Sequence, residues 1–354
     1  MSNKTKQKKK GLVSDSHRKK EPQVLKDRIG KYLRERTGNY VFDEFSDGYL
    51  ERANLTHILK GVPIPISKKD MENLNTLKVA KNMAYVIGCD INFKYREEYL
   101  SFIKSTFGDD FVRALIATAV ELAEKKEFID ACVILRGALL LDPDNQDAIY
   151  CYARACHDIY QIADNEDFVG RFKAESMEAF EKVTIKAPEF DMGYYFLGYA
   201  YMNLGLYLKA KLTFAEFTKK TSDEKLKAEV TEWMKKLEEP VKIEEGYNRI
   251  ISGRYDEGIE ILKPYCEDDR FNSWWPLWYY IGIAENARGN FAQAVDSLKQ
   301  ALSLSPSNTD CMEEVIKAYE KLGDETNIKK YRQKIDIVNK NREEERVDKN
   351  PGIS

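Results

Sequence analysis

Histidine is scarce in this sequence, with only three copies in 354 residues, at positions 17, 57 and 157. The sequence also has no His-Glu-x-x-His, no Gly-x-Ser-x-Gly, no phosphate-binding loop and no Cys-x-x-Cys pair. Those motifs carry the common metal, nucleophile and nucleotide chemistries. We therefore expect no catalytic residue, no bound cofactor and no metal site, and we interpret the protein as one that is not an enzyme.

Long apolar runs are missing as well, so the sequence predicts no membrane span. The basic N-terminus is not followed by an apolar segment, which argues against a secretory signal. Six cysteines without paired spacing are typical of reduced thiols. The net charge of −3 argues against nucleic acid as a partner of the whole chain. Together these features predict a cytoplasmic protein.

The N-terminal third of the chain shows helical spacing without a repeat. Residues 1–23 carry eight Lys and Arg against two acids, which predicts a disordered basic tail. In residues 24–110, one apolar stripe runs from Tyr49 to Leu59 and another from Leu74 to Ile87, both at helical spacing. Pro63 and Pro65 predict an extended link between them. Gly88 is expected to end the second helix.

A repeated spacing begins further along the chain. In each copy a glycine is followed after seven residues by a second glycine, then after two by an aromatic residue and after three by a small one. The three copies are Gly198, Gly205, Tyr207, Ala210; Gly246, Gly253, Tyr255, Gly258; and Gly282, Gly289, Phe291, Ala294. This period predicts pairs of helices stacked as an array.

Physical reasons support these residue types. A glycine inside a helix costs about 1 kcal/mol relative to alanine, so the first glycine predicts a close helix contact, expected with the small residue at the end of each copy. The second glycine suits the left-handed conformation at which a helix stops and reverses. The aromatic residue is expected to begin the second helix.

These residues resemble the tetratricopeptide repeat (TPR), whose first helix reads here as Tyr194, Leu197-Gly198 and Tyr201. Two further copies read Ala119, Leu122, Phe128, Ala131, Ala138, Pro143 and Trp278, Gly282, Ala294, Ala301, Pro306. The resemblance covers residues 111–340, with five units and a degenerate sixth at Tyr319. It implies an all-α, right-handed α-solenoid of stacked antiparallel helix pairs, preceded by the non-repeat helical region 24–110.

Two spacings exceed the 34-residue period of this family. The first excess, near residues 160–172, predicts a longer loop or a helix extension. The second, near residues 222–240, predicts an extra amphipathic helix that carries Val230 and Trp233 and ends at Pro240. A polar capping helix is expected at 328–346, and residues 341–354 are assigned to a polar C-terminal tail.

In this family the first helix of each unit lines a concave groove, which implies a partner-binding surface. The positions carried over from the family are Tyr150, Arg154 and His157; Tyr195, Tyr199 and Met202; Tyr247 and Ile250; and Tyr279, Ile283 and Asn286. Four of the tyrosines, Tyr195, Tyr199, Tyr247 and Tyr279, are expected to face one common surface. The alternative is that some of them pack between neighbouring units.

One subclass of the family clamps the C-terminal carboxylate of chaperone tails with basic and amide side chains. The corresponding positions here are Ile116, Val120, Tyr195, Tyr199, Tyr279 and Ile283, so a chaperone-tail partner is rejected.

The leading hypothesis is a non-catalytic scaffold that binds a peptide segment or a partner helix of another protein in the groove. Two alternatives stay open. One is a peptide-sensing regulator with a nucleic-acid-binding N-terminal region. The other is an enzyme with its site in residues 24–110.

Overall fold

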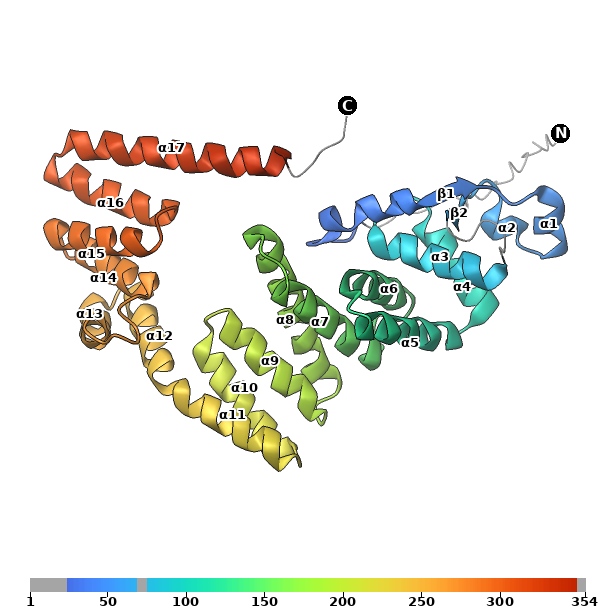
Figure 1. The fold of residues 1–354 in the computed structure, drawn as a ribbon, viewed down its shortest axis with the longest axis horizontal. Coiled ribbons are helices and arrows are strands. Elements are labelled where there is room, and N and C mark those ends of the chain that lie inside the picture. Colours follow the sequence, from blue (N-terminus) through green and yellow to red (C-terminus); the bar gives the residue numbers. More distant parts are fainter. Residues whose placement is uncertain (1–23, 69–74, 349–354) are drawn as a thin grey trace, which may run out of the picture. The chain divides into compact units, whose positions relative to one another are not determined.

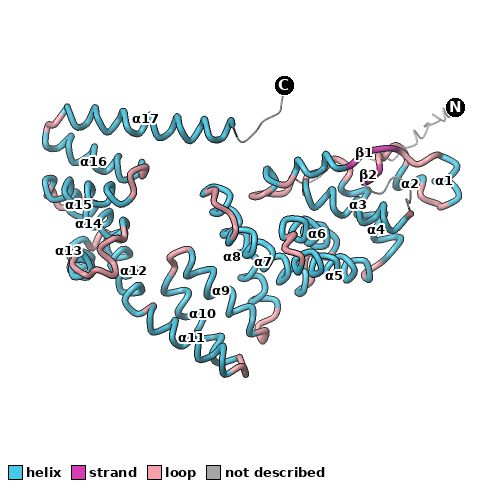
Figure 2. The backbone as a smooth tube through the Cα atoms, in the orientation of Figure 1, coloured by secondary structure: helices cyan, strands magenta, loops and turns pink. Residues whose placement is uncertain are grey.

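The computed structural model describes residues 24–68 and 75–348, and most of this length is helical (Figures 1 and 2). The all-α class predicted from the sequence is confirmed. The predicted disordered tail, residues 1–23, lies outside the described residues. Within the described part of the chain, no helix is both long enough and apolar enough to cross a membrane. Two compact units divide the chain, Met1–Pro188 and Glu189–Ser354, and each is described by itself.

The first unit starts with short elements and continues with longer helices. The short elements are the 3-10 helices η1 (Gly30–Tyr32) and η2 (Arg34–Asn39), strand β1 (Tyr40–Asp43), α1 (Asp47–Arg52), α2 (Thr56–Leu59) and strand β2 (Ile64–Ser67). The longer helices are α3 (Thr76–Cys89), α4 (Arg96–Phe107), α5 (Asp110–Glu124), α6 (Phe128–Leu141), α7 (Gln146–Gln161) and α8 (Glu166–Lys186).

Strands β1 and β2 form a two-stranded antiparallel sheet, which the helical spacing of residues 24–110 did not predict. The register places Phe42 opposite Pro65 and Asp43 opposite Ile64. Proline has no N–H to donate and is therefore confined to edge positions of a sheet. The carbonyl oxygen of Pro65 accepts a hydrogen bond from Nδ2 of Asn82 on α3, at 3.1 Å. The extended link predicted from the two prolines thus becomes part of β2.

Gly88 is the penultimate residue of α3, which ends at Cys89, but it is not one of the glycines with positive φ. A Cβ atom added to Gly88 would lie 2.0 Å from the carbonyl oxygen of Val133 on α6. The glycine is therefore required by a close approach of two helix backbones. The apolar stripe from Tyr49 to Leu59 is also divided, between α1 and α2, by Asn54 with φ of 54°.

One hydrophobic core joins the non-repeat segment to the first repeats. Leu50, Leu59, Met83, Phe102 and Leu115 belong to it, and each is at most 1% exposed. Residues 24–110 therefore pack as part of the first unit.

The second unit consists of helices in sequence. They are α9 (Asp191–Asn203), α10 (Tyr207–Lys220), α11 (Glu224–Lys236), α12 (Glu238–Ile251), α13 (Tyr255–Leu262), η3 (Lys263–Cys266), α14 (Trp275–Ala287), α15 (Phe291–Leu304), α16 (Thr309–Leu322) and α17 (Glu325–Asp348).

Consecutive helices pack in pairs in both units. Among the described residues the pairs are α5 with α6, α7 with α8, α9 with α10, α12 with α13, α14 with α15, and α16 with α17. These pairs agree in number with the five units and the degenerate sixth that the spacing predicted.

The second glycine of each repeated set ends the first helix in the left-handed region. Gly205, Gly253 and Gly289 have φ of 73°, 81° and 81°. The next helix then begins at the predicted aromatic residue, namely Tyr207, Tyr255 or Phe291.

The first glycine of each set makes the predicted close contact with the paired helix, where the nearest atoms belong to the residue one turn after the predicted small one. A Cβ atom on Gly198, Gly246 or Gly282 would lie 2.3 Å from the ring of Phe214, 2.5 Å from Leu262 or 2.5 Å from Leu298, respectively. In all three units this neighbour lies one helical turn after the small residue that was predicted to contact the glycine. The close contact is therefore confirmed. The predicted small residue lies at the same crossing in two units, because a Cβ atom on Gly258 would lie 2.9 Å from the carbonyl oxygen of Gly246 and one on Gly282 would lie 3.4 Å from that of Ala294.

Both additional segments are largely helical, although the first also contains the non-helical connection 162–165. The first becomes the opening turns of α8, which starts at Glu166. The second becomes α11, in which Val230 is fully buried. Helix α11 ends at Lys236 and not at the predicted Pro240, which lies in the first turn of α12, where a missing N–H costs nothing.

The last helix, α17, covers α16 with a narrow apolar stripe. Ile328 and Tyr331 are 3% and 6% exposed. The predicted capping helix is therefore present. It includes residues 341–348, which the sequence assigned to the C-terminal tail.

Candidate functional site

The predicted residues of the first unit share one face of α7. Nη1 of Arg154 donates to the hydroxyl of Tyr150, one turn earlier, at 3.4 Å. The Tyr150 ring also packs edge-on against Phe180 of α8, with centroids 6.3 Å apart. His157 continues this face and lies 3.4 Å from Gln161 through its Nε2 atom. The predicted residues Tyr150 and Arg154 thus lie together, and the Tyr150 ring packs against the paired helix α8.

Residues 24–39, which we call the N-terminal strap, are held against α8 by opposite charges. Arg28 pairs with Glu175 at 3.0 Å and with Glu178 at 2.5 Å. Lys31 pairs with Asp167 at 2.6 Å. The additional turns of α8 therefore provide one of the acids that anchor the strap.

These contacts alter the acidity of the carboxyl groups. Burial opposes the ionisation of Asp167, but hydrogen bonds from Lys31, Tyr32 and Arg171 outweigh it and hold its pKa below the ordinary value. For Glu178, the hydrogen bond from Arg28 is the largest cause of a lowered pKa.

A buried ion pair fixes the start of the strap. Nη2 of Arg136 donates to Oδ2 of Asp27 at 2.8 Å, and each side chain is only 5% exposed. Oδ1 of Asp27 accepts a further hydrogen bond from the backbone N–H of Gly30 at 2.8 Å. A buried charge without its partner is strongly unfavourable, so this pair holds the strap in one position.

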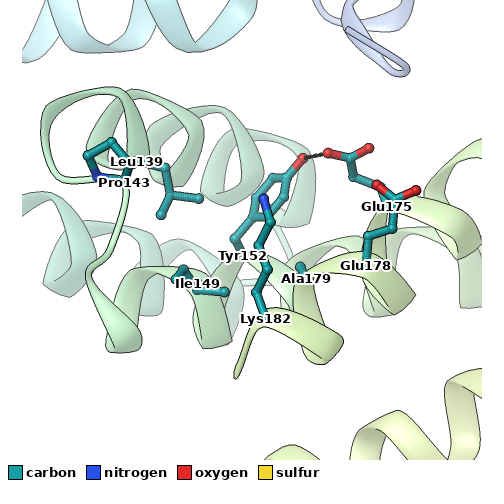
Figure 3. A pocket seen from close by; sticks show the side chains of 8 residues that line it. All are labelled: Leu139, Pro143, Ile149, Tyr152, Glu175, Glu178, Ala179 and Lys182. Atoms are coloured by element: carbon teal, nitrogen blue, oxygen red, sulfur yellow. Dashed lines mark hydrogen bonds between the residues drawn. The ribbon is translucent and has the colours of Figure 1, made fainter. Parts of the chain in front are cut away.

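A cavity of about 160 Å³ lies between α6, α7 and α8 (Figure 3). It is lined by Leu139, Pro143, Ile149, Tyr152, Glu175, Glu178, Ala179 and Lys182. Figure 3 shows the Tyr152 hydroxyl directed at the carboxylate of Glu175, to which it donates at 2.7 Å. Because Glu175 and Glu178 also bind Arg28, the acids of this cavity take part in anchoring the strap.

In the second unit, four residues form what we call the tyrosine–glutamate cluster: Tyr195 and Tyr199 on α9, and Glu229 and Trp233 on α11. Oε1 of Glu229 accepts hydrogen bonds from Tyr195 at 3.1 Å and from Tyr199 at 2.6 Å. The two tyrosine rings pack edge-on at 5.0 Å, and Tyr199 meets Trp233 edge-on at 6.2 Å. Burial, followed by the hydrogen bond to Glu229, raises the pKa of Tyr199.

The other two predicted tyrosines belong to a second aromatic group, which spans α12 and α14. Tyr247 stacks on Tyr280 with centroids 4.5 Å apart, and Tyr280 contacts Tyr279 edge-on at 5.4 Å. Burial raises the pKa of Tyr247. Burial, with the nearby acids Glu314 and Asp310, raises the pKa of Tyr279 to about 12. The structure therefore places the four tyrosines in two groups, with Tyr280 between Tyr247 and Tyr279, and one common surface for all four stays a prediction.

Asn286 and Met202 complete the predicted set. Nδ2 of Asn286 donates to the carbonyl oxygen of Glu314 on α16, at 3.0 Å, so this residue links two successive first helices. Within the described residues, Oδ1 of Asn286 and the hydroxyl of Tyr247 are buried without a hydrogen-bond partner. Met202 lies half-buried, one turn after Gly198 on α9.

Among the described residues, no group of three or more His, Cys, Asp or Glu side chains is placed to hold a metal ion. Burial raises the pKa of the Cys89 and Cys311 thiols to about 12. Because the thiolate is the reactive form, these cysteines behave as small apolar core residues.

Sequence reasoning missed Glu229. It is one glutamate on a highly charged helix, and Lys225 stands four residues before it, a spacing typical of a solvated ion pair. Only the packing of α11 beside α9 brings it to the two tyrosines. Trp233 could be identified from the sequence, because it lies on the amphipathic helix predicted for the second additional segment.

No protein-family model matches the chain, and no curated protein matches it by sequence. Among solved structures, a crystal structure of MamA protein is 14% identical, covers 69% of this chain and 97% of its own, and has a TM-score of 0.26. MamA from residue 41 to its end, from Desulfovibrio magneticus RS-1, is 9% identical over 65% of this chain and 93% of its own, with a TM-score of 0.26.

YrrB, described as a TPR protein with an unusual peptide-binding site, is 17% identical. It covers 60% of this chain and 95% of its own, with a TM-score of 0.29. Superpositions this loose carry no functional argument, and the chain's architecture rests on its own helix pairs and their repeated glycine contacts.

Proposed function

We propose that this protein is a non-catalytic scaffold that binds a segment of another protein, either an extended peptide or a helix. The binding surface is formed by the first helices of successive repeats within Glu189–Ser354. Its main contacts are Tyr195, Tyr199, Tyr247 and Tyr279. Met202 and Asn286 extend it. A cytoplasmic location fits this role.

The observation that carries the proposal is the repetition of half-exposed tyrosines at equivalent positions. Tyr195 and Tyr279 each precede the contact glycine of their unit by three residues, and Tyr199 and Tyr247 each follow it by one. All four are neither fully buried nor fully exposed. Tyrosine combines a large apolar area with a polar hydroxyl, and it is enriched in protein interfaces.

The face of α7 that carries Tyr150 and Arg154 is a second contact area of the same kind. Arg154 supplies a positive charge for an acidic group on the partner. Since Arg154 also donates to Tyr150, its guanidinium is held in place beside an aromatic ring.

The regulator and enzyme alternatives both require a site in residues 24–110. That segment buries its apolar side chains in a core shared with α5 and α6. Packing of this kind favours a structural role for the segment, namely that of completing the first unit.

The test is site-specific photo-crosslinking in cells. A benzophenone amino acid replaces Met202 in one variant and Leu212, which is 61% exposed on α10, in a control variant. We expect a discrete crosslinked protein from position 202 only, and its loss when Tyr195 and Tyr199 are both changed to alanine. Circular dichroism confirms that the double variant folds. Equal crosslinking from positions 202 and 212, or crosslinking that survives the double substitution, contradicts the proposed surface.

A further inference from the structure

We propose that the tyrosine–glutamate cluster binds the guanidinium group of an arginine side chain on the partner protein. This inference rests on the proposed function and names the chemistry that one part of its surface recognises. It rests on the charge of Glu229, the aromatic rings of the cluster and the second carboxylate oxygen of Glu229.

The charge of Glu229 is exposed and has no basic partner among the described residues, whereas its neighbours are neutralised within their own helices. On α11, Glu224 pairs with Lys227 at 3.6 Å and Glu232 pairs with Lys235 at 2.7 Å. Glu229 instead accepts two tyrosine hydroxyls. These donors fix the position of the carboxylate without cancelling its charge, so a cation from outside the unit is the complementary group.

The two tyrosines that bind this carboxylate pack against each other, and Tyr199 also packs against Trp233. The rings of Tyr195 and Tyr199 meet at an interplanar angle of 64°, and those of Tyr199 and Trp233 at 82°. Ring faces attract cations through their quadrupole. The chain already uses this property here, because Nζ of Lys236 lies 4.7 Å from the centroid of Trp233.

The geometry favours arginine over lysine. Oε1 of Glu229 is occupied by the two hydroxyls, while Oε2 accepts no hydrogen bond from a described residue. A guanidinium is planar, so it can stack on a tyrosine ring while its N–H groups reach a carboxylate in the same plane. An ammonium is compact and more strongly hydrated, and gains less from such a site.

The experiment uses fluorine NMR on the full-length chain labelled with 5-fluorotryptophan, in which the Trp233 resonance is identified with Trp233→Phe. The probe is N-acetyl-L-arginine methylamide at low salt. The matched control probe is the citrulline analogue, which has the same shape and no charge. The matched control variant is Glu232→Gln, because Glu232 is a nearby exposed acid on the same helix that is already paired with Lys235.

We expect a saturable shift of the Trp233 resonance with the arginine probe and none with citrulline. Glu229→Gln should weaken binding by about tenfold or more, as expected for the loss of a charge-assisted hydrogen bond. Glu232→Gln should leave it within about twofold, since exposed ion pairs contribute little.

Three results overturn the inference: an equal shift with citrulline, unchanged binding in Glu229→Gln, or equally tight binding of the lysine analogue. The crosslinking test separates this inference from the proposed function. A crosslinked partner at position 202 that survives Glu229→Gln leaves the scaffold role standing and removes the arginine site. Arginine binding without any crosslinked partner leaves the arginine site standing and removes the scaffold role.

Discussion

Gly88 of α3 and Gly137 of α6 face each other at a point where the two helix backbones touch. A Cβ atom on Gly88 would lie 2.0 Å from the carbonyl oxygen of Val133 and 3.2 Å from the backbone nitrogen of Gly137. A Cβ atom on Gly137 would lie 2.3 Å from the carbonyl oxygen of Ala84. Both obstacles are backbone atoms of a helix, which cannot rotate away. The non-repeat segment is thus joined to the repeats through this contact.

We predict that Gly137→Ala destabilises the protein by about 1–3 kcal/mol or more, because the methyl group forces α3 and α6 apart. The measurement is urea unfolding followed by circular dichroism. The control is Gly170→Ala in α8, where an added Cβ meets nothing within 4 Å. That change should stabilise by up to about 1 kcal/mol through helix propensity alone. Equal effects of the two substitutions would contradict the backbone contact.

The contact between Gly282 and Leu298 should show energetic coupling. Gly282→Ala places a methyl group 2.5 Å from Cγ of Leu298, and we expect it to cost about 1–3 kcal/mol. In the background of Leu298→Ala the same change should cost much less, because the space is then open. A double-mutant cycle in urea measures the coupling. Simple additivity would show that the register assigned to this repeat is wrong.

Removing Asp27 should leave Arg136 as a buried charge without its counter-ion. We expect Asp27→Ala to lower the free energy of unfolding by about 3–5 kcal/mol. Arg113→Ala is the control, because Arg113 pairs with Asp110 at the surface, with side chains 76% and 80% exposed. That pair should contribute about 1 kcal/mol or less. Similar losses of the free energy of unfolding in the two variants would mean that the pair of Asp27 and Arg136 stabilises the protein no more than a surface ion pair does.

Acid should weaken the attachment of the strap. The pKa values of Asp167 and Glu178 are lowered in the folded protein. A lowered pKa gives stability that is present above the ordinary carboxyl value, about 4, and is lost as the pH falls through the folded value. The melting temperature of Asp167→Asn should therefore lie below that of the wild type at pH 7, and the difference should shrink toward pH 3.

Asp164→Asn is the control for this measurement, because Asp164 is an exposed acid in the segment just before α8. Its melting temperature should follow that of the wild type throughout. A constant difference between Asp167→Asn and the wild type over the whole pH range would mean that ionisation of Asp167 does not hold the strap.

The sequence by itself determined the features that depend on neighbouring residues. The seven-residue step from Gly198 to Gly205 sets where a helix tolerates a close contact and where it reverses. The aromatic residue at position 207, 255 or 291 marks the start of the following helix. Such features are local, because a left-handed glycine or a helix start is decided within one turn of the chain. The helix pairs could therefore be assigned from spacing alone.

Tertiary structure decided which distant residues meet. Gly88 was expected to end its helix, which it does to within one residue, and only the approach of α6 shows that it is also a crossing point. The side chain of Leu298 lies nearer to Gly282 than the backbone of Ala294 does, because one helical turn of offset between paired helices is set by packing and not by spacing. Glu229 reaches Tyr199 only because α11 folds back beside α9. The register between helices is fixed by the burial of a shared core. Many residues that lie far apart in the sequence contribute to this burial, so their combined effect cannot be derived from a single sequence.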